Sequence, residues 1–155
     1  MLDLSTRRAQ DESGFTLIEL LVVILIIGIL AAIAIPALLG QKSKAYDSSA
    51  KTLAQTAQTA AETYSTENNG LYTFTEAKQL NAIEPTINYT KTTEADLTVA
   101  TGIEGNAGYE VTATAQNTAD KYTVRRLATG VVEHKCASSA SVKGCPGHSE
   151  SSTSW

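Results

Sequence analysis

The chain is poor in several residue types, and each scarcity narrows the functions open to it. Its 155 residues include one Trp, one Met, two His and two Cys, and aromatic residues make up 6%. Lys and Arg total 12 against 16 acidic residues, so the basic footprint of a nucleic-acid-binding protein is missing. The sequence also lacks the nucleophile motifs of hydrolases and glycine-rich phosphate loops. We therefore expect neither an enzyme nor a nucleic-acid partner.

The apolar residues are concentrated near the N-terminus, between Phe15 and Leu39. Within this block, residues 20–35 contain no charged or strongly polar side chain. A helix needs about 20 apolar residues to cross a bilayer. A chain of one-domain size has no core large enough to surround a helix that is apolar on every face. We therefore expect this block to span a membrane.

A secretory signal peptide is the main rival interpretation of the block. Arg7-Arg8 would be its charged start and Ala32-Ile33-Ala34 its cleavage site. Two features argue against it: Glu19 lies inside the apolar block, and Asp11-Glu12 separates the arginines from it. An ionisable group within a membrane segment costs roughly 2.5 to 3.5 kcal/mol, so such a residue usually has a function.

The block begins with the motif Gly14-Phe15-Thr16-Leu17-Ile18-Glu19-Leu20-Leu21. Together with the apolar run and Pro36, this motif resembles the class III leader of type IV prepilins. The resemblance implies that a membrane peptidase cuts between Gly14 and Phe15 and methylates the new amino group of Phe15. The chain departs from the family pattern before the glycine, where Asp11-Glu12-Ser13 stands in place of the frequent basic residue.

The resemblance also implies roles in assembly for two residues of the helix. Glu19 would face the amine of Phe15 on a neighbouring subunit, because an unpaired charge in an apolar core is costly. Its alternative role is to complement the positive end of the helix dipole near the headgroups. Pro36 would let the helix bend or melt locally within a filament; the alternative is a tolerated kink without consequence.

Beyond the apolar block, the sequence predicts an α+β fold in which the long N-terminal helix packs on a small antiparallel β-sheet head. Small apolar residues recur every three or four positions from Tyr46 to Tyr64, and the helix is expected to end at Asn68-Asn69-Gly70. The expected parts are a leader (1–14), the membrane-spanning assembly half of the helix (15–40), its amphipathic half (41–68) and the head (69–155).

Within the head, the local patterns predict one short helix and an antiparallel meander. Thr73 and Glu76 have the spacing of a capping box, which places a helix at 74–82. Alternating apolar and polar residues predict strands. The expected strands are 97–101, 109–115, 121–127 and 131–136, with 87–90 as a further candidate.

The cysteines lie close together near the C-terminus, and they have two possible uses. Cys136 and Cys145 would close a short loop as a disulfide, and the family resemblance implies such a pinned C-terminal loop. Alternatively, His134, Cys136, Cys145 and His148 offer four zinc ligands. The disulfide is favoured because the head is expected outside the cytoplasm.

These patterns favour a structural subunit of a type IV pilus or related filament. The resemblance implies self-assembly, a prepilin peptidase, an inner-membrane assembly platform and membrane lipid before assembly as partners. It implies a single-pass membrane protein that later joins a filament on the bacterial surface. One alternative is a pseudopilin of a type II secretion or DNA-uptake system. Another is a signal-anchored extracellular binding module, with a modest basic cluster of Lys121, Arg125, Arg126, Lys135 and Lys143.

Overall fold

In a computed structural model, the structure describes residues 14–90, 94–138, 145 and 155. Its elements are α1 (Leu17–Glu67), α2 (Ala77–Ile83), β1 (Ala95–Ile103), β2 (Gly108–Ala115), β3 (Lys121–Arg126) and β4 (Val132–Ala137). The chain divides into two compact units, Met1–Leu38 and Leu39–Trp155, and α1 contributes residues to both. The predicted fold class, a long apolar N-terminal helix with an antiparallel sheet head, is confirmed.

Helix α1 ends where the sequence predicts. Asn69 and Gly70 adopt left-handed backbone conformations, with φ of 55° and 80°, which residues without β-branching tolerate best. The Gly70 N–H then donates to the Ser65 carbonyl at 2.7 Å, so a carbonyl of the last turn gains a partner. The helix runs without interruption across Pro36 in the single chain, and the bending or melting expected within a filament stays a prediction.

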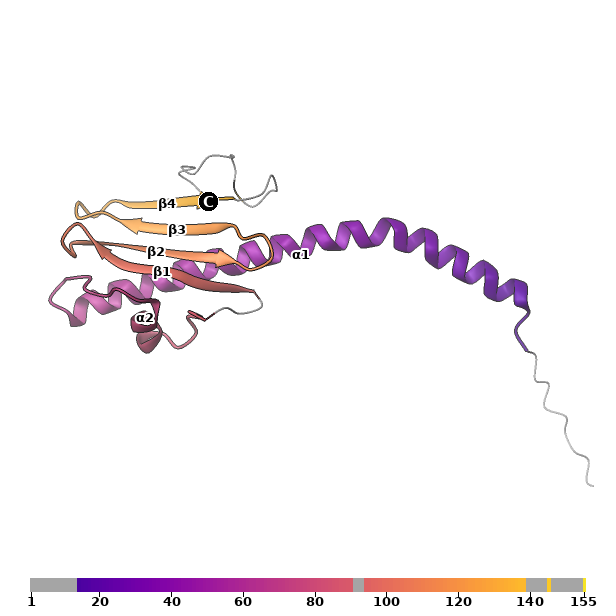
Figure 1. Cartoon of the computed structure of the whole chain (residues 1–155), viewed down its shortest axis with the longest axis horizontal. Coiled ribbons are helices and arrows are strands. Elements are labelled where there is room, and N and C mark those ends of the chain that lie inside the picture. The colour runs from indigo at the N-terminus through magenta and orange to yellow at the C-terminus, as the bar shows by residue number, and fades with distance from the viewer. Residues whose placement is uncertain (1–13, 91–93, 139–144, 146–154) are drawn as a thin grey trace, which may run out of the picture. The chain divides into compact units, whose positions relative to one another are not determined.

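The sheet is a four-stranded antiparallel meander in the order β1-β2-β3-β4, and it lies over the second half of α1 (Figure 1). Its strands match the four predicted ones, with bounds that differ by a few residues. Alternation in β2 places Tyr109, Val111 and Ala113 in the core, whereas Glu110 is only half-buried on the other face. The hydrophobic pattern therefore sets which face of the sheet meets the helix.

The core forms between the sheet and a stripe of alanines on α1. Ala54, Ala57 and Ala61 are completely buried together with Val111 and Val124 of the sheet. Small side chains let the helix backbone approach the sheet closely, and the large side chains of the strands fill the remaining space. This arrangement explains why the inner stripe of α1 consists of small residues.

Helix α2 begins later than its predicted start. The helix starts at Ala77, and its capping box uses Glu76 and Gln79 instead of Thr73 and Glu76. The Gln79 side chain accepts the Glu76 N–H at 3.1 Å. Phe74 cannot join the helix, because its carbonyl accepts the Gly102 N–H of β1 at 2.9 Å and its ring is fully buried. The proposed capping box at Thr73 was therefore wrong.

Residues 87–90 do not form the further strand that the sequence suggested. The Ile87 N–H donates to the Glu84 carbonyl in a turn, and the Ile87 carbonyl accepts the Asn81 side chain at 2.9 Å. One contact with the sheet remains, from the Leu97 N–H to the Asn88 carbonyl at 2.7 Å. Backbone groups committed to the turn cannot also form a ladder with β1.

Glu62 joins the end of α1 to the sheet and to the segment after the helix. Its carboxylate accepts the hydroxyls of Tyr72 at 2.8 Å and Tyr109 at 3.2 Å, and it lies 3.3 Å from the Arg126 guanidinium. Burial, reinforced by the Glu62 carboxylate, raises the pKa of Tyr109, so its hydroxyl stays protonated and donates. These contacts fix the helix end against β2 and β3.

The C-terminal residue docks on the head, a question that the sequence left open. The Trp155 indole N–H donates to the Lys135 carbonyl of β4 at 3.0 Å. Its ring meets Tyr122 edge-on at 5.6 Å and His134 at 4.9 Å between centroids. The Lys51 ammonium of α1 lies 5.9 Å from the indole centroid. Trp155 thereby covers the core where β4 approaches α1.

Candidate processing and assembly site

The predicted cleavage position lies outside regular structure. Gly14, Phe15 and Thr16 precede the first turn of α1, and the Phe15 side chain is 91% exposed. A peptidase needs an accessible backbone, and this segment is exposed and free of regular secondary structure. A Cβ added to Gly14 would meet nothing within 4 Å. The fold of the described chain therefore gives no steric reason for glycine at this position.

Glu19 belongs to a capping box with Thr16, which the sequence reasoning missed. The Glu19 carboxylate accepts the Thr16 N–H at 2.8 Å and the Thr16 hydroxyl at 2.7 Å. In return, the Glu19 N–H donates to the Thr16 hydroxyl at 3.3 Å. The pattern Thr-x-x-Glu before an apolar run was a visible marker of this cap. Within one chain, Glu19 thus serves the start of its own helix.

The assembly half of α1 exposes its apolar side chains along its whole length. Large aliphatic residues from Leu17 to Leu39 are between 45% and 82% exposed. By length and composition this helix is able to span a membrane, and none of its most apolar stretch is buried. Such a surface is stable in lipid or against other apolar helices, not in water. Pro36 lies in this half, and its role in assembly stays a prediction.

Cys136 and Cys145 are joined in a disulfide, with their Cα atoms 5.7 Å apart. Cys136 is buried near the end of β4, so the bond attaches Cys145 to the core. His134 packs against Trp155. His148, the fourth member of the alternative zinc set, lies outside the described residues. The cysteine sulfurs are committed to each other, which removes them as zinc ligands in this state.

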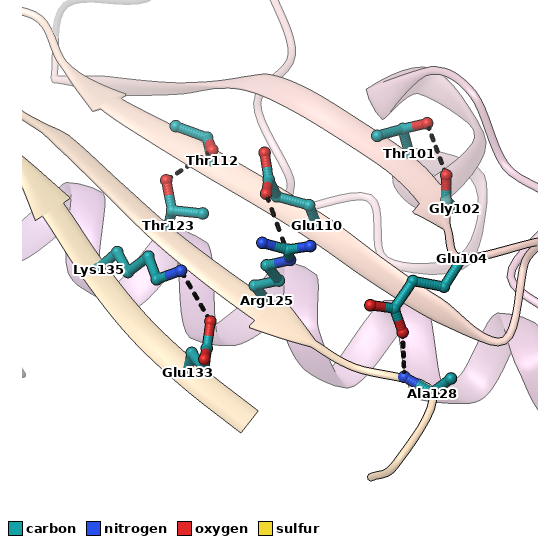
Figure 2. A network of polar contacts seen from close by, with 10 residues as sticks. All are labelled: Thr101, Gly102, Glu104, Glu110, Thr112, Thr123, Arg125, Ala128, Glu133 and Lys135. Carbon is teal, nitrogen blue, oxygen red and sulfur yellow. Dashed lines mark hydrogen bonds and ion pairs between the residues drawn. The ribbon is translucent and has the colours of Figure 1, made fainter. Parts of the chain in front are cut away.

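Three members of the basic cluster on the head lie beside acids, two of which belong to the same sheet and one to α1. Figure 2 shows Arg125 facing Glu110, 3.9 Å apart, and Lys135 facing Glu133, 2.7 Å apart. Arg126 pairs with Glu62. Lys143, the remaining member apart from the exposed Lys121, lies outside the described residues. Paired charges attract phosphate weakly, so these contacts do not support a nucleic-acid interface.

A second group of polar side chains is buried where α1 enters the head. Asp47 accepts the Thr118 hydroxyl at 2.7 Å, and Asp120 accepts the Ser138 hydroxyl at 2.6 Å. The other carboxylate oxygen of Asp120 is buried without a hydrogen-bond partner in the described part of the chain. An unpartnered charged oxygen in the core costs stability. Sequence patterns did not indicate this group, because its members come from distant elements.

Replacing Asp120 by Asn should stabilise the head at neutral pH. Burial raises the pKa of Asp120 above its ordinary value of 3.8; the Ser138 hydrogen bond opposes this shift, and the Asp47 carboxylate adds to it. A pKa raised on folding gives stability that is full below the unfolded pKa and lost as the pH rises through the folded pKa. We expect Asp120→Asn to gain about 1 kcal/mol at pH 7 and to lose this advantage as the pH falls towards about 4.

Thermal unfolding midpoints between about pH 3 and pH 8 measure this effect. Glu67→Gln removes one exposed carboxylate at the other end of the head and serves as the matched control, with little change expected. An advantage of Asp120→Asn that stays constant at every pH would assign the effect to packing instead of ionisation.

The family model described as the prokaryotic N-terminal methylation motif matches residues 10–35. The type II secretion system core protein G of Escherichia coli is 35% identical over 100 residues, covering 58% of this chain and 69% of that protein. The Vibrio cholerae protein of the same name is 34% identical over 80 residues, covering 52% and 55%. The type IV wide pilus major component PilA4 of Thermus thermophilus is 44% identical over 68 residues, covering 44% and 51%.

The family model covers an N-terminal stretch of the chain, and several of the matches to relatives are short. Alignments with two further proteins named type II secretion system core protein G, from Klebsiella michiganensis and Aeromonas hydrophila, span only 27% and 42% of those relatives. No solved structure matches the chain significantly. The match to the family model thus contains the candidate site, from Gly14 through the first part of α1.

Proposed function

Because the chain belongs to the family of type IV pilins and pseudopilins, we propose that it is a structural subunit of a type IV pilus or a related filament. A prepilin peptidase cuts it between Gly14 and Phe15 and methylates Phe15. Before assembly, the assembly half of α1 anchors the subunit in the membrane. An inner-membrane platform then moves the subunit into a filament whose surface is formed by the heads. Its role is structural and not catalytic.

The observation that carries this proposal is the accessible Gly14–Phe15 bond directly before an exposed apolar helix. The peptidase requires the accessible bond, and both insertion into the membrane and helix bundling require the exposed apolar helix. In this chain the bond directly precedes the helix. Within the described part of the chain, a Cβ at position 14 would meet no atom within 4 Å, so packing there does not account for the glycine. Recognition by a processing enzyme supplies a reason for it under this proposal.

A pseudopilin of a secretion system is the second candidate function. The relatives named type II secretion system core protein G favour it. The C-terminal disulfide between Cys136 and Cys145 favours a pilin, because the family resemblance associates such a pinned loop with pilins. The two functions differ in the length and the position of the filament, so the cellular location of the mature chain distinguishes them.

Processing is tested by the intact mass and N-terminal sequence of the chain recovered from cell envelopes and from sheared surface material. We expect a chain that begins at methylated Phe15 in both fractions. The matched variant Gly14→Val should stay at full length and be missing from the sheared fraction. A mature chain that begins after Ala34 would instead reveal a secreted domain and overturn the proposal. Processed protein confined to the envelope would favour the pseudopilin.

A further inference from the structure

The end of the head where α1 enters has an uneven distribution of charge. Its exposed cations are Lys42 and Lys44 on α1 and Lys121 at the start of β3. These positions share one end of the head, because Asn117 of the β2–β3 connection donates to the Ser43 hydroxyl at 3.2 Å. In Figure 1, that connection lies along α1 at this end of the sheet. We call Lys42, Lys44 and Lys121 the lysine end.

The acids of this region are turned inward. Asp47, Asp96 and Asp120 are 5%, 8% and 0% exposed. Each carboxylate accepts a side-chain hydrogen bond, from Thr118, Gln116 and Ser138 respectively. Among the acids that the structure describes here, only Glu94 is exposed, and it accepts the Ser49 hydroxyl at 3.4 Å. The surface is thus cationic although the region contains several carboxylates.

We propose that the lysine end binds the anionic headgroups of the membrane that holds the subunit before assembly. This inference rests on the proposed function, which puts residues up to Leu39 in lipid. Lys42 follows Leu39 within one helical turn, so its ammonium reaches the headgroup layer. Each lysine near an anionic surface strengthens binding about fivefold at physiological ionic strength. Anionic phospholipid supplies both the complementary charge and a surface continuous with the apolar helix.

The arrangement also has a consequence for assembly. Headgroup contacts hold the head close to the bilayer before assembly. These contacts are lost when the subunit leaves the membrane and enters a filament. Because Asp47 and Asp120 are engaged inside the head, they do not neutralise the lysines in the waiting state. During assembly the lysine end can therefore release the lipid headgroups and contact a neighbouring subunit.

The test uses the full chain in nanodiscs that contain equal amounts of phosphatidylcholine and phosphatidylglycerol. Native mass spectrometry counts the lipids that stay bound after release from the disc. We expect bound phosphatidylglycerol to exceed phosphatidylcholine by about 25-fold or more for the unchanged chain, because Lys42 and Lys44 each contribute about fivefold. Lys44→Gln should lower this ratio by about fivefold, and Lys42→Gln with Lys44→Gln should lower it by about 25-fold. Sodium phosphate and sodium chloride at equal ionic strength should weaken the preference equally, which separates headgroup binding from a phosphate site.

Lys78→Gln is the matched control, because Lys78 is an exposed lysine on α2 and its loss makes the same change in net charge. We expect this control to keep the full preference. A ratio near one for the unchanged chain, or an equal loss in Lys78→Gln, would overturn the proposal. So would lysine variants that keep their lipids but fail to enter filaments, since the lysines would then contact another subunit. Filament formation by the unchanged chain is scored separately, so its failure would count against the proposed function alone.

Discussion

We expect Gly102→Ala to destabilise the head by about 3 kcal/mol, because the added methyl group has no room. A Cβ at Gly102 would collide with the backbone carbonyl of Tyr72 and with the Asn106 side chain. The collision cannot be relieved by rotating a side chain, because the 72–74 segment is tied to β1. The Gly102 N–H donates to the Phe74 carbonyl, and the Tyr72 N–H donates to the Asn106 carbonyl, each at 2.9 Å.

Urea unfolding of the full chain in detergent micelles measures this loss. Trp155 is the only tryptophan and is docked on the head, so its fluorescence reports the head. The matched control is Gly105→Ala in the following turn. Gly105 has a φ of 68° but open space around it, so only backbone strain of about 1 kcal/mol is expected. Equal losses in the two variants would refute the steric explanation.

The long helix and the meander could be predicted because each has a strong local cause. An apolar run, a small-residue stripe and an Asn-Gly end define α1, and strict alternation defines β2. Helix α2 was placed wrongly because Thr73 and Gln79 both offer capping partners for Glu76 in the sequence. Which of the two capping boxes forms depends on Phe74. Its side chain is buried and its carbonyl accepts the Gly102 N–H, so Phe74 cannot be part of the helix. Such contacts are long-range, and no local pattern contains them.

The functional residues likewise fall into those that a local sequence motif predicts and those that become neighbours only in the folded chain. Its linear part, from Gly14 to Glu19, is a motif and could be read directly. The buried pair of Asp47 and Asp120 was invisible, because these residues become neighbours only when the β2–β3 connection docks on α1. The ion pair of Arg125 with Glu110 depends likewise on strand register, because the two residues face each other across β2 and β3. The sequence presented Arg125 as a member of a basic cluster, whereas the register places an acid beside it. Glu133 and Lys135, by contrast, lie two residues apart on β4, so their pairing is local.

Glu19 has two possible roles, capping its own helix and pairing with a neighbouring subunit. The capping box allows mutations to distinguish the two roles. Its carboxylate caps the start of α1 through the Thr16 N–H at 2.8 Å. Under the proposed function it would also pair with the methylated amine of Phe15 on a neighbouring subunit. Capping requires an acceptor oxygen and no charge, since glutamine serves in capping boxes as well as glutamate. Pairing with a cationic amine in an apolar bundle requires the negative charge itself.

We therefore expect Glu19→Gln to be processed and inserted normally but to lower the filament fraction at least about tenfold, because the neighbouring amine would lose its partner. Glu19→Ala should fail to the same degree, although it also loses the cap. The measurement is the ratio of mature chain in sheared material to mature chain in the membrane, with processing checked by mass. If Glu19→Gln assembled normally while Glu19→Ala did not, the glutamate would act through the cap alone. Assembly would then be driven by the apolar face of α1, and the register between subunits would have to be set by packing rather than by charge.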